Sequence, residues 1–212
     1  MSILKKIFKK EKVRYKSFTN YNENEPFVII SNNCWGAEIY KDFNKQFNTP
    51  FIGLFLYAQD YIKLLENFNH YLSLPLEFSN SSKWINSFNY PVGLLGDVEL
   101  HFLHYESEKE ALDKWSRRVS RMKQVSEDNY FFKICDRDNG NIDIIKRFHL
   151  LKFKNKISFS IFDFEHSNHI KVIENEKNKS VEDGILLYNV TNKYTDIGYW
   201  INNKILKKND VK

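Results

Sequence analysis

Short apolar runs alternate with amphipathic stretches along most of this chain, from Pro26 onward. Four runs have the character of buried strands: 27–31, 50–56, 129–135 and 156–162. Three further stretches repeat apolar residues with helical spacing: 59–72, 107–125 and 142–148. This order is typical of βαβ units, in which helices connect parallel strands. The sequence therefore predicts an α/β fold with three layers, in which a mostly parallel sheet has helices on both faces.

Two local motifs refine this prediction. Ser107 followed by Glu110 forms a capping box, in which each side chain satisfies an amide at the start of a helix. Gly96-Asp97 lies between two apolar runs and is typical of a two-residue hairpin turn. We therefore expect a helix that begins after Ser107, and one antiparallel hairpin on the otherwise parallel sheet.

The apolar spacing also predicts which side chains the two longer helices bury. In the first helix these are Tyr61, Ile62, Leu64, Leu65 and Phe68. In the second they are Ala111, Leu112, Trp115, Val119 and Met122.

Length and composition indicate one folded unit with a short appendage. The 212 residues fit one domain, and a hydrophobic fraction of 42% excludes a disordered chain. We predict a basic amphipathic tail over residues 1–20 and a single α/β domain over residues 21–212. Cys34 and Cys135 lack the spacing of a metal site or a disulfide framework, so we expect free thiols.

Positive charge is concentrated at the start of the chain. Residues 1–16 carry a net charge of +6, against +5 for the whole chain, so the remainder is close to neutral. A nucleic-acid partner is therefore not expected, because its phosphates require a basic face on the folded body. Ile3, Leu4, Ile7 and Phe8 fall on one side of a helix opposite lysines, a pattern typical of contact with an anionic membrane surface. The alternative is a solvated tail.

No run approaches the roughly 20 apolar residues of a membrane span. Residues 1–16 also lack the apolar core of a secretory signal. We therefore expect a cytoplasmic protein, peripheral at the inner face of the membrane if residues 1–16 bind there.

The turn after the first strand is the leading candidate for a ligand site, because ligands of open α/β sheets bind beyond the carboxyl ends of the strands. Asn32 and Asn33 tolerate turn conformations, and Gly36 allows close backbone approach. Trp35 could stack on a sugar ring, or be part of the core. The predicted ligand-binding residues are Asn32, Asn33, Trp35, Gly36, His101, Tyr105, Arg118 and Arg121.

Cys34 lies where a helix should begin, which is expected to lower the pKa of its thiol. A thiolate nucleophile would then need a base, and His101 or His104 could supply it. The alternative is an inert packing thiol, with Asn32 and Asn33 forming an amide-lined floor. On that interpretation His104 or Glu99 is the candidate base.

Asp136 and Asp138 follow a predicted strand, and two carboxylates at this spacing can share one divalent ion. Magnesium or manganese would there neutralise the diphosphate of a nucleotide sugar, while Arg118 and Arg121 hold the phosphates or an acidic sugar. Two alternatives stay open. The aspartates can bond their own turn, and the arginines can belong to a solvated helix face.

Six ordered sequence blocks resemble one bacterial family. They are FVIISNNCWG (27–36), NTPFIGLF (48–55), DYIKLL (60–65), YPVGLLGDVELHFLHY (90–105), KWSRRV (114–119) and DNYFFKICDRD (128–138). The family is a domain of unknown function that carries the label exopolysaccharide or capsular polysaccharide biosynthesis protein. The resemblance implies a three-layer α/β fold and a role in surface glycans, and it supplies no catalytic residues. The family often has glycine directly after the second aspartate, whereas Asn139 precedes Gly140 here.

We therefore expect a role in surface-polysaccharide biosynthesis, as a glycosyltransferase-like enzyme that acts on an activated sugar or glycan. One alternative is a non-catalytic glycan-binding or scaffold protein of the assembly complex. Another is an acyl-type transferase that uses Cys34.

Overall fold

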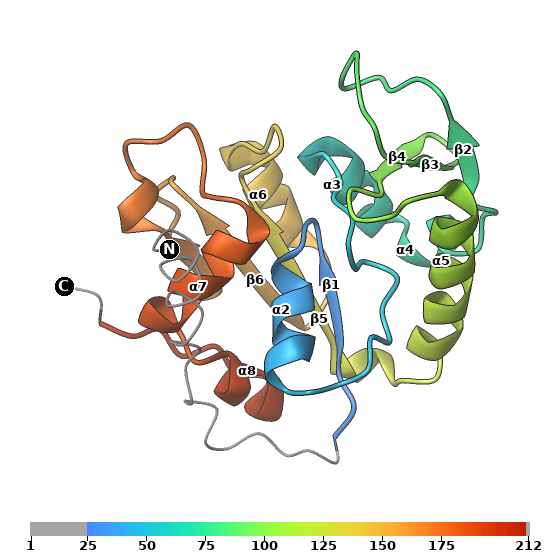
Figure 1. Cartoon of the computed structure of the whole chain (residues 1–212). Coiled ribbons are helices and arrows are strands. Elements are labelled where there is room, and N and C mark those ends of the chain that lie inside the picture. Colours follow the sequence, from blue (N-terminus) through green and yellow to red (C-terminus); the bar gives the residue numbers. More distant parts are fainter. Residues whose placement is uncertain (1–24, 211–212) are drawn as a thin grey trace, which may run out of the picture.

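The computed structural model describes residues 25–210 and contains a four-stranded parallel sheet (Figure 1). Its strands are β1 (Val28–Ser31), β5 (Tyr130–Cys135), β6 (Asn155–Ser160) and β7 (His169–Lys171), in that spatial order. Each neighbouring pair is parallel. The whole of the predicted tail, residues 1–20, lies outside the described residues, and so does the predicted membrane contact of residues 1–16.

Helices cover both faces of this sheet, which confirms the predicted three-layer α/β fold. Side chains alternate along β5, so that Phe131 and Cys135 face one core while Phe132 and Ile134 face the other. The first core is closed by α2 (Trp35–Asp42), α7 (Gly184–Tyr194) and α8 (Ile197–Asn203). The second is closed by α3 (Ala58–Glu66), α4 (Phe68–Tyr71) and α6 (Ile142–Leu150). Short 3₁₀ turns occur at η1 (Glu127–Asn129) and η2 (Ile173–Asn175).

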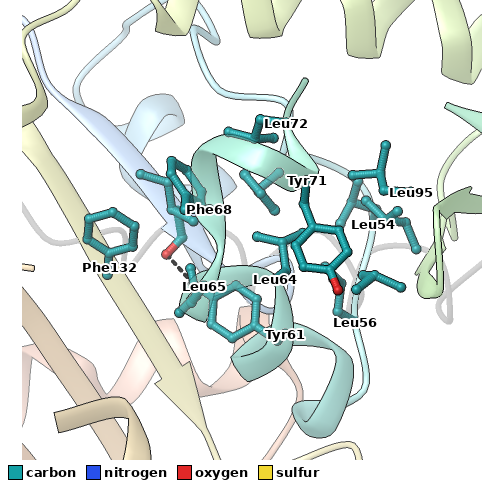
Figure 2. Packing of buried hydrophobic residues seen from close by; sticks show 14 of the residues in the cluster. Leu54, Leu56, Tyr61, Leu64, Leu65, Phe68, Tyr71, Leu72, Leu95 and Phe132 are labelled. Atoms are coloured by element: carbon teal, nitrogen blue, oxygen red, sulfur yellow. Dashed lines mark hydrogen bonds between the residues drawn. The ribbon is translucent and has the colours of Figure 1, made fainter. Parts of the chain in front are cut away.

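The predicted helix over residues 59–72 is divided into α3 and α4. The break falls at Asn67, whose φ of −130° and ψ of 48° are not helical. All five predicted inward side chains are buried. Figure 2 shows Tyr61, Leu64, Leu65 and Phe68 between Phe132 of the parallel sheet and a group of leucines that includes Leu54 and Leu95.

The predicted hairpin is present, but its expected place on the parallel sheet is wrong. β3 (Val92–Leu95) and β4 (Val98–His101) pair across Gly96, whose φ is 58°, and β2 (Glu77–Ser79) completes a separate antiparallel sheet. The strands cannot extend the parallel sheet at β1 because other groups occupy that edge. The Tyr61 hydroxyl donates to Ile30 O at 2.8 Å, and the Leu56 amide donates to Asn32 O at 3.0 Å.

Residues 50–56, predicted as a strand, instead connect the two sheets. Leu56 bonds to the turn after β1, while Phe55 and His101 exchange backbone hydrogen bonds of 3.0 and 2.9 Å. Gly53 has a φ of 73°, which interrupts an extended conformation between these contacts. The segment therefore brings the end of β4 to the carboxyl end of β1.

The helix after the capping box is α5 (Glu108–Met122). Ser107 Oγ accepts from the Glu110 amide at 3.2 Å, as predicted, while the Glu110 carboxylate accepts from the Glu106 amide at 2.8 Å. Ala111, Trp115 and Met122 are buried and Val119 is half-buried, but the prediction for Leu112 is wrong because it faces solvent. Within residues 25–210, no helix has the length and apolar character needed to span a membrane.

Candidate functional site

A pocket of about 470 Å³ opens beyond the carboxyl ends of β1 and β5, and we call it the β1–β5 pocket. Residues that follow the two strands form its floor: Asn33, Cys34, Arg137 and Asp138. Residues of the segments around 53–55 and 90–104 form one wall: Phe55, Tyr90, Leu103 and His104. The start of α7 forms the other wall: Asp183, Gly184 and Ile185. The structure thus brings together four sequence-predicted residues, Asn33, Cys34, His104 and Asp138.

Beneath the floor lies Lys133, a completely buried lysine that the sequence prediction missed. Its Nζ donates to Asn32 Oδ1 at 3.1 Å, to Asn33 Oδ1 at 2.9 Å and to Cys135 Sγ at 3.2 Å. Burial lowers the pKa of Lys133, while the nearby Cys135, Asp138 and Asp136 raise it. A single lysine inside the apolar run 130–135 was the available signal, since a buried lysine needs partners.

Asn32 and Asn33 therefore fix the turn after β1 through bonds to Lys133. Asn33 Oδ1 also accepts from the Trp35 amide at 3.3 Å, and Asn33 Nδ2 donates to Cys135 Sγ at 3.2 Å. Both asparagines are buried, and only Asn33 contributes to the pocket lining. These bonds support the turn-fixing alternative for both side chains, and a ligand contact of Asn33 stays a prediction.

Trp35 and Gly36 are packing residues, so their predicted ligand contacts are wrong. Trp35 is completely buried, and its Nε1 donates to Thr191 Oγ1 of α7 at 3.0 Å. A Cβ on Gly36 would lie 2.9 Å from Ile29 Cγ2, so this glycine allows α2 to lie close against β1.

Cys34 is the N-cap of α2 and lines the pocket, but its pKa rises to about 11 instead of falling as expected. Burial is the main cause, and it outweighs the opposing charge of Lys41. Gly184 also covers the start of α2, because a Cβ there would lie 2.4 Å from the Trp35 nitrogen. The thiol of Cys34 is therefore protonated at neutral pH, which argues against a thiolate nucleophile.

This environment predicts slow alkylation of Cys34. Because its pKa is about two pH units above the ordinary thiol value of 9.0, we expect a roughly 100-fold smaller thiolate fraction at pH 8 and a correspondingly slow reaction with iodoacetamide. Mass spectrometry of timed samples measures the rate, with urea-unfolded protein and Cys34→Ser as references. Alkylation of the folded protein at the unfolded rate would restore Cys34 as a candidate nucleophile.

Asp136 is a structural tie between three segments of the chain. Its two carboxylate oxygens accept from the Ile161 amide at 2.9 Å and from the Val181 amide at 3.0 Å. The side chain is 2% exposed, and burial raises its pKa while these two donors oppose the rise. Asp136 does not line the pocket, so the structure separates it from Asp138. Within residues 25–210, no group of three or more His, Cys, Asp or Glu side chains is arranged to hold a metal ion.

Asp138 is the aspartate of this loop that lines the pocket. Asp138 and Asn139 both have left-handed backbone, with φ of 61° and 64°, and Asp138 O accepts from the Ala58 amide at 2.9 Å. Burial raises the pKa of the Asp138 carboxyl to about 6, although the charges of Arg137 and Lys133 oppose this. Arg137 lines the same pocket, and its Nη1 donates to Val181 O at 3.4 Å. The pocket thus contains both the Asp138 carboxyl, with its pKa of about 6, and the Arg137 guanidinium.

An aromatic wall, formed by Phe55, Tyr57, Trp84, Tyr90 and His101, stands beside Asp138. Phe55 stacks on His101 with ring centroids 4.7 Å apart, and Tyr57 stacks on Trp84 at 4.8 Å. Phe55 and Tyr90 present this wall to the pocket. Burial is the main cause of the raised pKa of Tyr57 and of Tyr90, and the charge of Asp138 is a smaller contribution to both.

Glu99 and His101 do not line the pocket, so neither is placed there as the predicted base or ligand contact. Glu99 accepts from Ser82 Oγ at 2.7 Å and from the Lys83 amide at 2.8 Å, which fixes the loop before β3. His101 is completely buried, with Nε2 3.4 Å from Glu99 Oε2. Burial lowers the pKa of His101 despite the opposing effect of Glu99. His104, in contrast, is exposed at the pocket lining.

The predicted phosphate contacts Arg118 and Arg121 lie away from the β1–β5 pocket. Arg118 is buried and donates to the Tyr105 hydroxyl at 2.6 Å, which in turn donates to Ile52 O at 2.6 Å. Tyr105 and Arg118 are thus an internal tie. Arg121 lines a different pocket of about 530 Å³, at the amino end of β1. Neither arginine therefore lines the β1–β5 pocket, where the predicted diphosphate contact would have to lie if Asp138 is part of the same site.

The start of α7 is the part of the site that the sequence prediction missed. Asp183 Oδ1 accepts from the Ile185 and Leu186 amides at 2.9 and 3.0 Å and so caps this helix. An aspartate immediately before an apolar run was the available signal for a helix start.

In comparisons with known proteins, the chain matches one family and one relative, and the description of neither names an activity. The family described as a domain of unknown function, DUF1919, matches residues 3–202. An uncharacterized protein of Haemophilus influenzae (strain ATCC 51907 / DSM 11121 / KW20 / Rd) is 44% identical over 137 residues. The alignment spans 65% of this chain and 63% of that relative's length.

Proposed function

Because the chain belongs to the DUF1919 family, whose description names no activity, we propose a function from its pocket: transfer of a glycosyl group to a glycan acceptor, with Asp138 as the base. The proposal rests on the position of the Asp138 carboxyl group. It lies in a pocket of about 470 Å³, which is large enough for one or two sugar rings, opposite Phe55 and Tyr90. Aromatic faces of this kind pack against the apolar faces of sugars.

The proposed step needs a base whose pKa lies near the working pH. Asp138, with a pKa of about 6, takes the proton of an acceptor hydroxyl as the hydroxyl oxygen attacks the anomeric carbon of the donor. The bond from that carbon to the diphosphate breaks, and the diphosphate leaves with the bonding electrons. Arg137 is the cation at the pocket floor that would bind the leaving oxygens. His104 is a further polar side chain of the pocket lining.

The predicted metal pair is not part of this proposal. Asp136 does not line the β1–β5 pocket, and both of its oxygens accept backbone amides, so we assign no ion-bridging role to it. In this proposal Asp138 is the base alone, and Asp183, the other carboxylate of the pocket lining, caps α7.

The biological setting that we propose is assembly of bacterial exopolysaccharide or capsule at the inner face of the membrane. It is supported by the sequence resemblance and by the basic, amphipathic pattern of residues 1–16.

The proposal predicts transfer or hydrolysis that depends on Asp138. We expect a panel of uridine diphosphate sugars, with magnesium or manganese present, to raise the melting temperature and to release uridine diphosphate. Asp138→Asn should reduce that release at least 100-fold, because it removes the base. The release by the unchanged protein should rise with pH through about 6, since the ionised carboxyl is the active form.

Asp163→Asn is the matched control, because Asp163 is an exposed aspartate outside the pocket, paired with Lys171 at 3.0 Å. It should keep full activity. Binding of a sugar nucleotide without release of the diphosphate would favour the non-catalytic glycan-binding alternative. Release that survives in Asp138→Asn would remove Asp138 from its proposed role.

A further inference from the structure

Large apolar side chains gather at the mouth of the β1–β5 pocket. Among residues 25–210, seven large hydrophobic side chains are exposed, and three of these lie here: Leu103, Ile185 and Leu186, at 44%, 41% and 48% exposure. Leu103 and Ile185 line the pocket from opposite walls, and Leu186 follows in the same turn of α7. Single exposed leucines are ordinary, but a cluster around a cavity indicates something that covers it.

Both sides of this mouth are held by backbone hydrogen bonds. Asp183 Oδ1 fixes Ile185 and Leu186 through their amides, as described above. On the other side the Leu103 amide donates to His101 O at 2.9 Å, and the His104 amide donates to Gly53 O at 3.0 Å. The apolar side chains therefore start from fixed positions, and a ligand that covers them does not have to order the backbone first.

The apolar surface continues from the mouth into the pocket. Phe55 and Tyr90 are half-buried in the wall, and Leu103 extends that wall outward. The polar residues Asn33, which is buried, and Asp138, which is half-buried, line the floor of the same pocket, whereas Leu103 and Ile185 are exposed. A bare sugar that reaches Asp138 would leave Leu103 and Ile185 in water. A ligand with a polar end and an apolar end would cover both kinds of surface.

We propose that the acceptor of the transfer is amphipathic: its sugar end lies at the floor, and an alkyl or isoprenoid-like chain lies against Leu103, Ile185 and Leu186. This inference rests on the proposed function for the orientation of the sugar. The apolar subsite itself is tested by binding alone, so it can hold or fail without any transfer. The apolar surface of the mouth is continuous with the pocket. We therefore assign it to the apolar part of the acceptor itself, and not to a separate ligand.

The test compares two probes with the same sugar, methyl β-D-glucoside and octyl β-D-glucoside, the latter below its micelle concentration. Chemical shift changes on isotope-labelled full-length protein measure both affinities. We expect the octyl glycoside to bind at least tenfold more tightly, because each buried methylene contributes about 0.8 kcal/mol. Leu103→Ser and Ile185→Ser should each remove most of that preference. Leu150→Ser should preserve it, since Leu150 is 82% exposed at the end of α6 and does not line the pocket.

Three results would overturn the proposal. The first is equal affinity for the two glycosides. The second is a dimer in sedimentation that Leu103→Ser dissociates, because a second copy of the chain would then cover the mouth. The third is binding to phosphatidylcholine vesicles that Leu103→Ser and Ile185→Ser abolish, without any preference for the octyl glycoside. Failure of the proposed transfer gives a different pattern, in which the octyl preference persists but Asp138→Asn changes no turnover.

Discussion

Asp138→Asn is expected to stabilise the protein at pH 7.5 by about 1–2 kcal/mol, although it should abolish the proposed transfer. Burial holds the pKa of this carboxyl at about 6, against an ordinary value of 3.8, so ionisation at neutral pH works against folding. A shift of two pKa units corresponds to about 3 kcal/mol, and we reduce that figure because the side chain is only half-buried. Asparagine also tolerates the left-handed φ of 61° at this position.

The pH dependence gives this prediction a definite sign. A raised carboxyl pKa contributes stability that is fully present below about 3.8 and is lost as the pH rises through about 6. The advantage of Asp138→Asn should therefore be absent near pH 3.8, grow between pH 4 and 6, and stay constant above that range. Urea denaturation of both proteins across this range measures the difference in unfolding free energy.

Asp163→Asn serves again as the control and should show no such increase in stability between pH 4 and 6. A destabilised Asp138→Asn variant at pH 7.5 would contradict the prediction, because it would show that the ionised carboxyl holds the fold together. A stabilising loss-of-function change is the behaviour expected of an active-site group, whose environment serves chemistry rather than stability.

Part of the order of strands and helices could be predicted, because several of these elements carry their own period. The helical spacing of residues 59–65 survives in α3, and the apolar run 130–135 is β5. For residues 50–56, the same approach gave a wrong prediction. These residues form hydrogen bonds to both sheets, to Asn32 after β1 and to His101 of β4, which are both distant in sequence. Such contacts leave no local pattern.

The location of the site was predictable from the rule that ligands bind beyond the carboxyl ends of parallel strands, and the roles of its residues were not. Asn33, His104 and Asp138 line one pocket, as that rule suggests. Residue type alone does not show which side chains are buried. Trp35 and His101 are completely buried in the structure, so neither is a candidate for contact with a ligand. Cys34 shows the same limit, because its desolvation outweighs the effect of its place at a helix start.

Asp136 and Asp138 illustrate what spacing alone omits. Two carboxylates at i and i+2 suggested a shared role. The positive φ of Asp138 and Asn139 reverses the chain there, so one carboxylate lies inside the protein and the other at the pocket. The two aspartates should therefore respond oppositely to substitution, and that contrast separates a structural carboxylate from a functional one.

Asp136→Ala is expected to destabilise the protein by about 3–5 kcal/mol. The change would leave the Ile161 and Val181 amides without their acceptors in a buried site, and a hydrogen bond to a charged group contributes about 1.5–3 kcal/mol. The lost tie would also release the end of β6 and the segment before α7, which forms a wall of the pocket. Denaturant unfolding in the presence of EDTA measures the loss, so that a bound metal ion cannot contribute.

Asp136→Asn keeps the prediction testable if the alanine variant does not fold. The amide oxygen of asparagine can accept from one of the two backbone amides, but its NH₂ group cannot accept from the other, so we expect a smaller loss of about 2 kcal/mol. A metal-binding role would give another pattern. Stability in EDTA would then be unchanged by either substitution, and only the stabilisation that manganese provides would disappear. The bonds of Asp136 to two backbone amides favour the first pattern, which leaves Asp138 as the chemically available carboxylate of this loop.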